Sequence, residues 1–396
     1  MSHGFDFDQE INRESSHSVK YDGRQAMFGT SDVIPVWVAD MDFAAPPAVT
    51  QALIERAKHP IYGYTQFPDS LYEALIDWMQ RRHHWNIEPD WIVMCPGVVP
   101  SLNAAVMALA QPGESIIIQP PVYFPFFSAA SQTGRQLLQN PLRLDNGHYT
   151  IDFDHLEHCA KEAKLLLFCS PHNPVGRVWQ RVELERLLAI AEKHQLIIFS
   201  DEIHADLIYP GNRHHALGTI SHDVNIITAV TPSKTFNIPG LNLSALIIPD
   251  KTIRAAINNV FNTLHVSASN PFSIAAFEAA YRDGEAWLEE LQHYLRDTRD
   301  EVCAFLAQHL PEIKVIPAQG TYLLWLDCRA WSMTDAQLKH FFIHEAGVGL
   351  NSGVQFGQEG SGFMRLNIGA PRCTVLKVLE QISQARITVK YTPPLQ

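Results

Sequence analysis

The sequence predicts an α/β protein with a large domain built on a mainly parallel sheet and a smaller α+β domain. Its 396 residues, 46% of them hydrophobic, exceed the usual size of a single core. Short apolar runs, such as residues 165–168 and 196–199, alternate with helical patterns, such as residues 187–194, as in parallel sheets. Polar side chains follow several of these runs, at the sheet edge where such proteins bind ligands.

The order of the elements sets the expected domain boundaries. Residues 1–30 are polar and contain turn signals, so we expect an arm that lies over the body or over a partner subunit. We assign residues 1–45 to this arm and part of the small domain, 46–284 to the large domain and 285–396 to the small C-terminal domain. The expected helices cover residues 47–58, 104–110, 187–194, 251–264, 271–282, 285–309 and 334–346, with a last one after residue 368, and the expected strands cover residues 115–119, 165–168, 196–199, 226–230, 243–248 and 362–368.

The composition argues against nucleic acid and membrane as partners. The chain has 30 Lys and Arg against 42 Asp and Glu, a net charge of −12, and no long basic block or interleaved basic and aromatic patch. No apolar run approaches the roughly 20 residues that span a bilayer, and the first residues lack the basic and apolar regions of a signal peptide. We therefore expect a soluble protein of the cytoplasm.

The cysteine and histidine patterns favour neither a disulfide framework nor a metal site. The six cysteines lack Cys-x-x-Cys pairs, which suits buried, reduced thiols and indicates no cysteine nucleophile. Among the 19 histidines, His340 and His344 have the spacing of one helix face, but no third ligand lies nearby in the sequence. We expect both to face solvent.

A lysine between two hydroxyl residues marks the centre of the expected site. In Thr231-Pro-Ser-Lys-Thr-Phe236, Lys234 follows the apolar run of residues 226–230 and so lies at the end of a strand. An amine there can form a Schiff base with an aldehyde cofactor, while the hydroxyl groups of Thr231 and Ser233 can bind a phosphate on the same molecule. This pattern points to pyridoxal 5'-phosphate. An ordinary exposed loop has the same composition and is the alternative.

Two further strand ends carry side chains suited to the same cofactor. Asp201 follows the run at residues 196–199 and can pair with the ring nitrogen of pyridoxal phosphate, whose protonated ring withdraws electrons from the substrate's alpha carbon. Asn173 follows the run at residues 165–168 and can donate a hydrogen bond to the ring hydroxyl. Three strand ends then converge on one cofactor.

Three motifs, in this order, resemble the fold-type I pyridoxal phosphate enzymes of the class I/II aminotransferase family: Asn173-Pro-Val-Gly176, Asp201-Glu-Ile-His204 and Ser233-Lys-Thr-Phe236. Together with Trp37-Val-Ala-Asp-Met-Asp-Phe43, they are most similar to the cystathionine beta-lyase branch typified by MalY and PatB. The likeness extends over nearly the whole chain. It implies the fold of the pyridoxal phosphate-dependent transferases, with a mainly parallel seven-stranded sheet, and a homodimer with shared active sites.

The resemblance also implies roles for individual residues. Tyr123 stacks on the pyridine ring and assists catalysis, Tyr64 reaches the phosphate of the neighbouring subunit, and Asp40 passes beside the substrate. His204 lies near the ring hydroxyl, and Asn173 contacts substrate as well as cofactor. Free amide groups at the start of a helix attract phosphate, and we expect them here from the backbone of Gly97, Val98 and Val99.

Arg365 stands in the apolar strand of residues 362–368, where an uncompensated charge would be costly. It therefore needs an anionic partner. The fork of a guanidinium suits the alpha-carboxylate of an amino acid, and the Arg-Leu-Asn setting resembles the arginine that binds the substrate carboxylate in this family. A structural salt bridge with a nearby carboxylate is the alternative.

Two positions depart from the wider family pattern. Many aminotransferases have a tyrosine where this chain has His204, and a phosphate-binding arginine where it has Asn242. The phosphate should therefore depend more on Thr231, Ser233, the helix-start amides and Tyr64. Both departures agree with the lyase branch.

The implied function is that of a carbon–sulfur beta-lyase, which releases thiol, pyruvate and ammonia from cysteine S-conjugates such as cystathionine. The substrate amine displaces Lys234 from the cofactor, and the freed lysine then removes the alpha proton. An aminotransferase uses the same lysine and aspartate and is the first alternative. A regulatory protein that binds a transcription factor through an enzyme-like fold is an alternative from another class.

Overall fold

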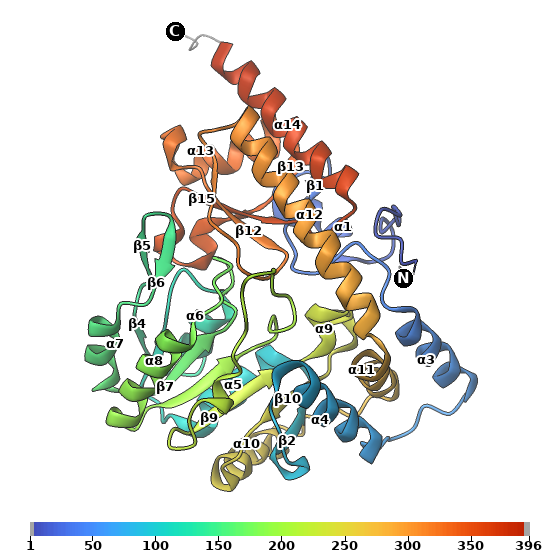
Figure 1. The fold of residues 1–396 in the computed structure, drawn as a ribbon, viewed down its shortest axis with the longest axis vertical. Coiled ribbons are helices and arrows are strands. Elements are labelled where there is room, and N and C mark those ends of the chain that lie inside the picture. The colour runs from blue at the N-terminus through green and yellow to red at the C-terminus, as the bar shows by residue number, and fades with distance from the viewer. Residues whose placement is uncertain (1–3, 392–396) are drawn as a thin grey trace.

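A seven-stranded sheet crosses the lower part of the molecule in the computed structural model, which describes residues 4–391 (Figure 1). In order across the sheet, its strands are β2 (Ile92–Cys95), β10 (Ser244–Ile247), β9 (Ile226–Val230), β8 (Ile197–Asp201), β7 (Ala163–Cys169), β3 (Ser115–Ile118) and β4 (Gln136–Gln139). The strands from β9 to β4 are parallel, while β10 is antiparallel to both of its neighbours. The prediction of a mainly parallel sheet of seven strands is confirmed.

The central strands are apolar runs because both faces of the sheet are covered. Along β7, Leu165 and Leu167 belong to one buried cluster, whereas Leu166 and Phe168 belong to another on the opposite face. Such strands have no solvent face and therefore lose the alternation of polar and apolar residues. The helices of this part of the fold are α4 (Asp69–His83), α5 (Val98–Leu109), α6 (Pro125–Ser131), α7 (Phe153–Ala160), α8 (Arg181–His194), α9 (Pro232–Thr235), α10 (Lys251–Thr263) and α11 (Pro271–Asp283).

A four-stranded antiparallel sheet lies above the first sheet in Figure 1. In order, its strands are β11 (Lys314–Val315), β12 (Leu323–Asp327), β15 (Phe363–Asn367) and β14 (Asn351–Ser352). The N-terminal region joins this part of the molecule, because β1 (Ile34–Pro35) pairs in parallel with β13 (Val348–Gly349). The remaining helices are α1 (Val19–Asp22), α2 (Arg24–Phe28), α3 (Pro47–Lys58), α12 (Glu285–His309), α13 (Asp335–His340), a π-helix at Phe341–Glu345 and α14 (Arg372–Tyr391).

Most expected helices and strands are present within a few residues. The polar arm contains the short helices α1 and α2. We did not predict α4, although its buried residues recur at helical spacing, or α6, α7, β2 and β4. None of the four residues of β4, Gln-Leu-Leu-Gln at the sheet edge, is fully buried. Also unforeseen were the hairpin of β5 (Arg143–Asp145) and β6 (His148–Thr150) and the 3₁₀ helices Pro89–Trp91, Leu217–Thr219, Pro239–Leu241, Arg329–Trp331, Gly353–Phe356 and Gln358–Gly360.

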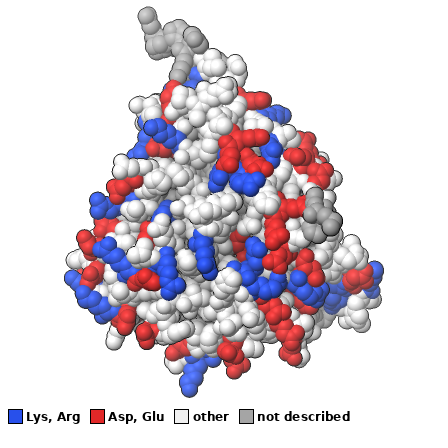
Figure 2. Space-filling view, in the orientation of Figure 1, with Lys and Arg blue, Asp and Glu red and all other residues white. Residues whose placement is uncertain are grey.

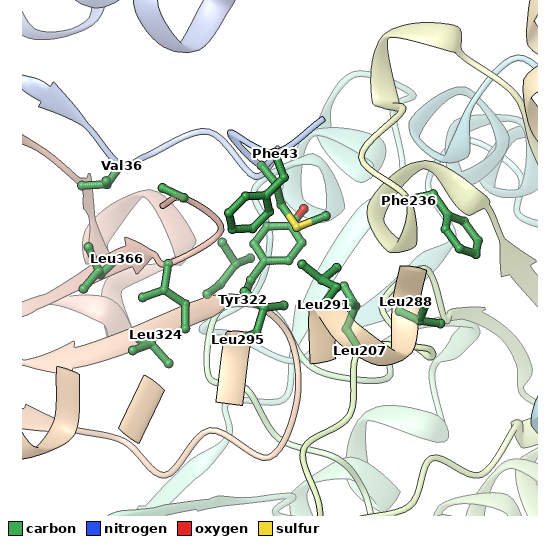
Figure 3. Packing of buried hydrophobic residues seen from close by; sticks show 14 of the residues in the cluster. Val36, Phe43, Leu207, Phe236, Leu288, Leu291, Leu295, Tyr322, Leu324 and Leu366 are labelled. Carbon is green, nitrogen blue, oxygen red and sulfur yellow. The ribbon is translucent and has the colours of Figure 1, made fainter. Parts of the chain in front are cut away.

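The long helix α12 connects the two parts of the fold through the hydrophobic core. Leu288, Leu291 and Leu295 follow each other at helical spacing and are almost completely buried. Figure 3 shows Leu291 and Leu295 beside Tyr322, with Phe43 close to the same ring, whereas Leu288 lies toward Phe236. Phe43 also packs against the ring of Tyr294 on α12. Because Phe43 ends the motif that begins at Trp37, α12 helps to hold the backbone of that motif in place.

Charged side chains of both signs are interspersed on the face shown in Figure 2. Within residues 4–391, no helix is both long enough and apolar enough to cross a lipid bilayer. The same part of the chain contains no group of three or more His, Cys, Asp or Glu side chains that could hold a metal ion. His340 and His344 are exposed, as predicted.

The expectation of buried thiols holds for four of the six cysteines. Cys303 is only partly buried, and the expectation is wrong for Cys373, which is exposed in the first turn of α14 and lies 3.2 Å from Glu10 Oε1. All six cysteines are free thiols. Cys373 is exposed because it lies on the side of α14 that faces the N-terminal arm and not on the side that faces the core.

We expect Leu291→Ala to lower the free energy of unfolding by about 2–5 kcal/mol, because it leaves a cavity between α12 and the core that cannot collapse. Urea denaturation measures this loss. His293→Ala, at an exposed position on the same helix, should change the free energy of unfolding by less than about 0.5 kcal/mol. Equal effects of the two substitutions would contradict the assigned packing of α12.

Candidate active site

A cavity of about 350 Å³ opens at the carboxyl ends of β7, β8 and β9. A second cavity, of about 740 Å³, shares Ala39, Tyr123 and Lys234 with it and extends to Asp40 and Arg365. The first cavity is lined by ten of the residues that the sequence predicted for cofactor binding: Gly97, Val98, Val99, Tyr123, Asn173, Asp201, His204, Thr231, Ser233 and Lys234.

Lys234 lies on the one-turn helix α9, directly after β9. Thr231 caps this helix, since its hydroxyl accepts a hydrogen bond from the amide of Ser233 (3.2 Å). The Lys234 amine, Nζ, donates a hydrogen bond to the carbonyl oxygen of Ala39 (2.7 Å). Burial lowers the pKa of Lys234 to about 8, with a further contribution from Arg365, whereas Asp40 and Asp201 oppose this shift. A useful fraction of the amine is therefore neutral near pH 7 to 8.

Asp201 ends β8 and is buried at the floor of the cavity. Its Oδ1 accepts a hydrogen bond from the amide of Ile203 (3.3 Å), and it forms no salt bridge within the described part of the chain. Burial raises the pKa of Asp201 to about 7, although the nearby Lys234 lowers it. A carboxylate in this setting gains much from a cationic donor such as a protonated ring nitrogen.

His204 is buried next to the ring of Tyr322, at 6.1 Å between centroids. Its Nδ1 has no hydrogen-bond partner among the described residues. Burial lowers the pKa of His204 to about 3, assisted by the charges of Lys234 and Arg365. The imidazole is therefore neutral, and one buried nitrogen is left for a ligand.

The end of the cavity formed by the start of helix α5 is suited to an anion. Helix α5 begins at Val98, and no side chain caps it. Its first amide groups have no partner within the helix and border the cavity. Gly97 precedes them with φ 142°, a conformation that favours glycine. Ser233 lines the same region.

The Thr231 hydroxyl is less available for binding phosphate than its position in the sequence suggested. Its hydroxyl donates to the carbonyl oxygen of Leu243 (2.8 Å) while it caps α9. The single hydroxyl proton is thus engaged within the protein. Asn242, at the position where many relatives in the wider family carry arginine, also lines the cavity.

Arg365 projects from the centre of β15 and is buried, yet its hydrogen-bond partners are neutral. Nη1 donates to Asn173 Oδ1 (3.0 Å), and Nη2 donates to Asn351 Oδ1 (2.7 Å) and to the carbonyl oxygen of Trp37 (2.9 Å). Nε has no partner among the described residues. Burial lowers the pKa of Arg365 to about 10, with Tyr123 and Tyr322 acting in the opposite direction. Within the described residues, the alternative of a structural salt bridge is not observed.

Asp40 and Tyr64, which the sequence predicted for the site, do not line the first cavity. Asp40 lines the second cavity, but its carboxylate accepts hydrogen bonds from Arg13 at Oδ1 (3.0 Å) and Oδ2 (2.7 Å). Tyr64 is fully exposed and does not line either cavity of its own chain. Its expected role needs a neighbouring subunit and stays a prediction.

Several residues of the site could not be recognised in the sequence. Tyr322 Oη donates to the same Ala39 carbonyl as Lys234 (2.9 Å), and Asn237 and Asn367 bind the backbone around that residue. These contacts join positions about 200 to 330 residues apart. The only sequence signal was the motif Trp37-Val-Ala-Asp-Met-Asp-Phe43, which gave the segment but not its partners.

Pyridoxal phosphate fits the side chains that surround the first cavity. A lysine amine of lowered pKa and a buried carboxylate, Asp201, line one cavity, and the uncapped start of helix α5 offers amide groups for a phosphate in the same cavity. The buried nitrogens without partners, His204 Nδ1 and Arg365 Nε, point to ligands that complete their hydrogen bonding. These are the group types that such a cofactor and an amino-acid substrate require.

Comparison with known proteins extends this picture to the whole chain. The sequence model of the class I and II aminotransferases matches residues 31–382. The chain is 42% identical over 383 residues to cystathionine beta-lyase PatB of Bacillus subtilis (strain 168), covering 96% of this chain and 99% of that protein. A pyridoxal phosphate-bound putative aminotransferase from Clostridium difficile 630 is similar in structure, with TM-score 0.95 and 38% identity over 96% of this chain and 100% of that one. Cystalysin from Treponema denticola, whose structure contains pyridoxal 5'-phosphate, gives TM-score 0.94 and 36% identity over 97% and 99% of the two chains.

The raised pKa of Asp201 predicts a pH-dependent cost to stability. The folded protein holds this proton up to pH about 7, whereas the unfolded chain loses it near pH 3.8, so stability falls as pH rises through that window. We expect Asp201→Asn to be more stable than the wild type at pH 8, without ligand, by up to about 4 kcal/mol, and by much less at pH 5. Urea denaturation at both pH values measures the difference.

Asp206 provides a matched control for this prediction. It is also buried, but hydrogen bonds from His83 and Thr235 outweigh burial and lower its pKa. Asp206→Asn should therefore destabilise the protein at pH 8. If both substitutions destabilise it, the electrostatic description of Asp201 is wrong.

Proposed function

Because the chain belongs to the class I and II aminotransferase family, we propose that it acts as a pyridoxal phosphate-dependent carbon–sulfur beta-lyase. It releases a thiol, pyruvate and ammonia from cysteine S-conjugates such as cystathionine. The observation that carries this proposal is the 42% identity to a cystathionine beta-lyase along nearly the full length of both chains. The side chains of the two cavities provide each group that the reaction needs.

The residues of the first cavity hold the cofactor, which withdraws electrons from the substrate's alpha carbon when bound. Lys234 would be its point of attachment, and the Asp201 carboxylate would pair with its ring nitrogen. Tyr123 would stack on the ring, while Asn173 and the neutral His204 would hydrogen-bond to its hydroxyl. Ser233 and the amides of Gly97, Val98 and Val99 would provide hydrogen bonds to its phosphate.

Arg365 binds the alpha-carboxylate of the substrate. Its guanidinium is buried, and the groups that accept its hydrogen bonds are all neutral. Because no carboxylate is among them, the positive charge attracts an anionic ligand strongly. Asn173 and Asn351 fix the plane of the fork through Nη1 and Nη2. The second cavity, which includes Arg365 and Lys234 in its wall, leaves room for the sulfur substituent.

Lys234 moves the proton of the alpha carbon. Its lowered pKa supplies a neutral Nζ near physiological pH, and the Ala39 carbonyl holds that nitrogen beside the carboxylate subsite. Nζ accepts the alpha proton, and the resulting ammonium donates a proton to the sulfur as the carbon–sulfur bond breaks. Water then converts the remaining three-carbon fragment to pyruvate and ammonia.

An aminotransferase would use the same Lys234 and Asp201 but would release a keto acid and leave the amino group on the cofactor. His204 and Asn242, which replace the tyrosine and arginine of many aminotransferases, both line the first cavity and favour the lyase. The products distinguish the two reactions. The cytoplasmic location expected from the composition stays a prediction.

A homodimer with shared active sites is part of this proposal. Tyr64 is fully exposed in a segment that also exposes Ile61 and Tyr62. Apolar side chains gathered on a surface in this way are typical of an interface. In the dimer, the Tyr64 hydroxyl reaches the phosphate end of the neighbouring site.

We expect the loaded enzyme to form pyruvate and thiol in equal amounts from cystathionine, and pyruvate and the hydropersulfide of cysteine in equal amounts from cystine, with little pyridoxamine phosphate. Pyruvate, thiol and pyridoxamine phosphate are followed together, and amino acid/keto acid pairs are tested in parallel. Lys234→Ala serves as the inactive control. Keto acid formation with stoichiometric pyridoxamine phosphate, and no thiol, would identify an aminotransferase instead.

Arg365→Lys should lower kcat/KM for amino-acid substrates, mainly by raising KM. The substitution keeps the charge but loses the fork of the guanidinium, which corresponds to a loss of about 1.5–3 kcal/mol in transition-state stabilisation. The visible absorbance of the bound cofactor should stay unchanged. Arg329→Lys is the matched control, since Arg329 forms a comparable two-pronged ion pair with Asp327 at the surface. Normal turnover by Arg365→Lys would mean that the carboxylate is bound elsewhere.

Mixing two inactive variants tests the shared site. If Tyr64 serves the neighbouring subunit, a mixed dimer of Tyr64→Ala and Lys234→Ala has one intact site, and random mixing recovers about a quarter of the wild-type activity. Activity is assayed after the two variants have exchanged subunits. A mixture that regains none, although mixed dimers form, would show that Tyr64 does not act across the interface.

A further inference from the structure

The backbone of residues 37–43, which we call the carbonyl segment, binds both polar groups that act on the substrate. The carbonyl oxygen of Trp37 accepts a hydrogen bond from Arg365 Nη2 (2.9 Å). The carbonyl oxygen of Ala39 accepts from Lys234 Nζ (2.7 Å) and from Tyr322 Oη (2.9 Å). The position of this segment therefore sets the position of the amine and of the guanidinium together.

Two asparagines hold the inner side of the carbonyl segment. Asn367 Nδ2 donates to the carbonyl oxygens of Val38 (2.6 Å) and Asp40 (2.7 Å). Asn237 Nδ2 donates to those of Met41 (2.8 Å) and Phe43 (2.7 Å), and its Oδ1 accepts from the amide of Met41 (2.8 Å). The backbone is thus fixed where it faces the two sheets.

The outer side of the segment is held by charges of the N-terminal arm. Lys20 Nζ lies 2.9 Å from Asp42 Oδ2 and 3.7 Å from Asp40 Oδ1, and its side chain has no exposed surface. Arg13 binds both carboxylates, at 2.7 Å from Asp40 Oδ2 and 2.6 Å from Asp42 Oδ1. We call Arg13, Lys20, Asp40 and Asp42 the arm cluster.

We propose that the arm cluster fixes the Ala39 carbonyl against the Lys234 amine, and that Lys20 is a positioning residue for the reaction. Asp40 directly follows Ala39 in the chain, so a shift of its carboxylate moves the carbonyl that holds Nζ. No contact within the described residues joins Lys20 to Lys234 itself, and Lys20 acts through the segment. This inference rests on the proposed role of Lys234 as the cofactor-binding base.

The charges of the arm cluster explain why a lysine is buried there. Two cations and two carboxylates balance, which reduces the cost of burying Lys20. Without Lys20, the negative charge of Asp40 and Asp42 is undercompensated close to Lys234, and it favours the ammonium form of Lys234. The pKa of Lys234 should therefore rise in such a variant. Among the described residues, the other titratable or charged groups around Lys234 are Asp201, His204, Tyr123, Tyr322 and Arg365.

The test measures how fast cofactor-free protein captures pyridoxal phosphate between pH 6 and pH 10. The capture rate, followed by visible absorbance, reports the neutral fraction of Lys234, with a midpoint near pH 8 in the wild type. The titrations of pyridoxal phosphate itself are common to all variants. Mass mapping after reduction first establishes that the wild type is labelled at Lys234. A wild type labelled elsewhere would contradict the proposed function, whatever the variants do.

Lys20→Met should move the midpoint up by about one pH unit, so that capture is about tenfold slower at pH 7 and unchanged at pH 10. Lys20→Arg should restore the wild-type midpoint. Arg24→Gln is the control, because Arg24 is a cation of the same arm that pairs with Glu14 rather than with the arm cluster. Should Lys20→Met not fold, Arg13→Gln, at a partly exposed position, should shift the midpoint in the same direction.

Two results would overturn the inference. One is an unchanged midpoint in folded Lys20→Met, or in Arg13→Gln if the first variant does not fold. The other is a rate reduced equally at every pH, which would indicate a general structural role without an effect on the amine. Either result, with the wild type labelled at Lys234, leaves the proposed function standing.

Discussion

The hydrogen bond between Lys234 Nζ and the carbonyl oxygen of Ala39 is the contact on which the rest of the site depends. It joins the end of β9, in the large sheet, to a backbone segment that is held by Asn367 at the end of β15, in the small sheet. The amine therefore reaches its position only when both parts of the fold have come together. Its lowered pKa follows from its burial in this assembly, with a further contribution from Arg365 on β15.

The site is built from charges that the protein does not neutralise by itself. Asp201 and Arg365 are buried without a salt bridge among the described residues, and His204 keeps an unpartnered nitrogen. Each weakens the ligand-free protein, whose total stability is typically about 5–15 kcal/mol. Lys20, buried just as deeply, has two carboxylates beside it. The buried charges of Asp201 and Arg365 thus lie at the positions proposed for cofactor and substrate, whereas Lys20, which we propose as a supporting residue, is paired.

The sequence predicted the large sheet and the edge that carries the candidate site because those features are local. Asn173, Asp201 and Lys234 each follow an apolar run closely, and a parallel sheet brings the ends of such runs together. It did not predict β4, whose edge position needs few buried residues, or the engagement of the Thr231 hydroxyl with Leu243. Tyr322, Asn237 and Asn367 were missed for another reason. They act on a carbonyl segment far away in the chain, and nothing in their own surroundings in the sequence indicates that contact.

The central claim is that the amine of Lys234 is the group that binds the cofactor. The most direct measurement incubates the protein with pyridoxal phosphate, fixes the adduct with borohydride and locates it by peptide mapping with mass spectrometry. The account predicts a single labelled lysine, Lys234, since burial gives its amine the lowered pKa of about 8 and the cavity admits the aldehyde beside it. A label on a different lysine, or no label on a folded protein, would contradict the account.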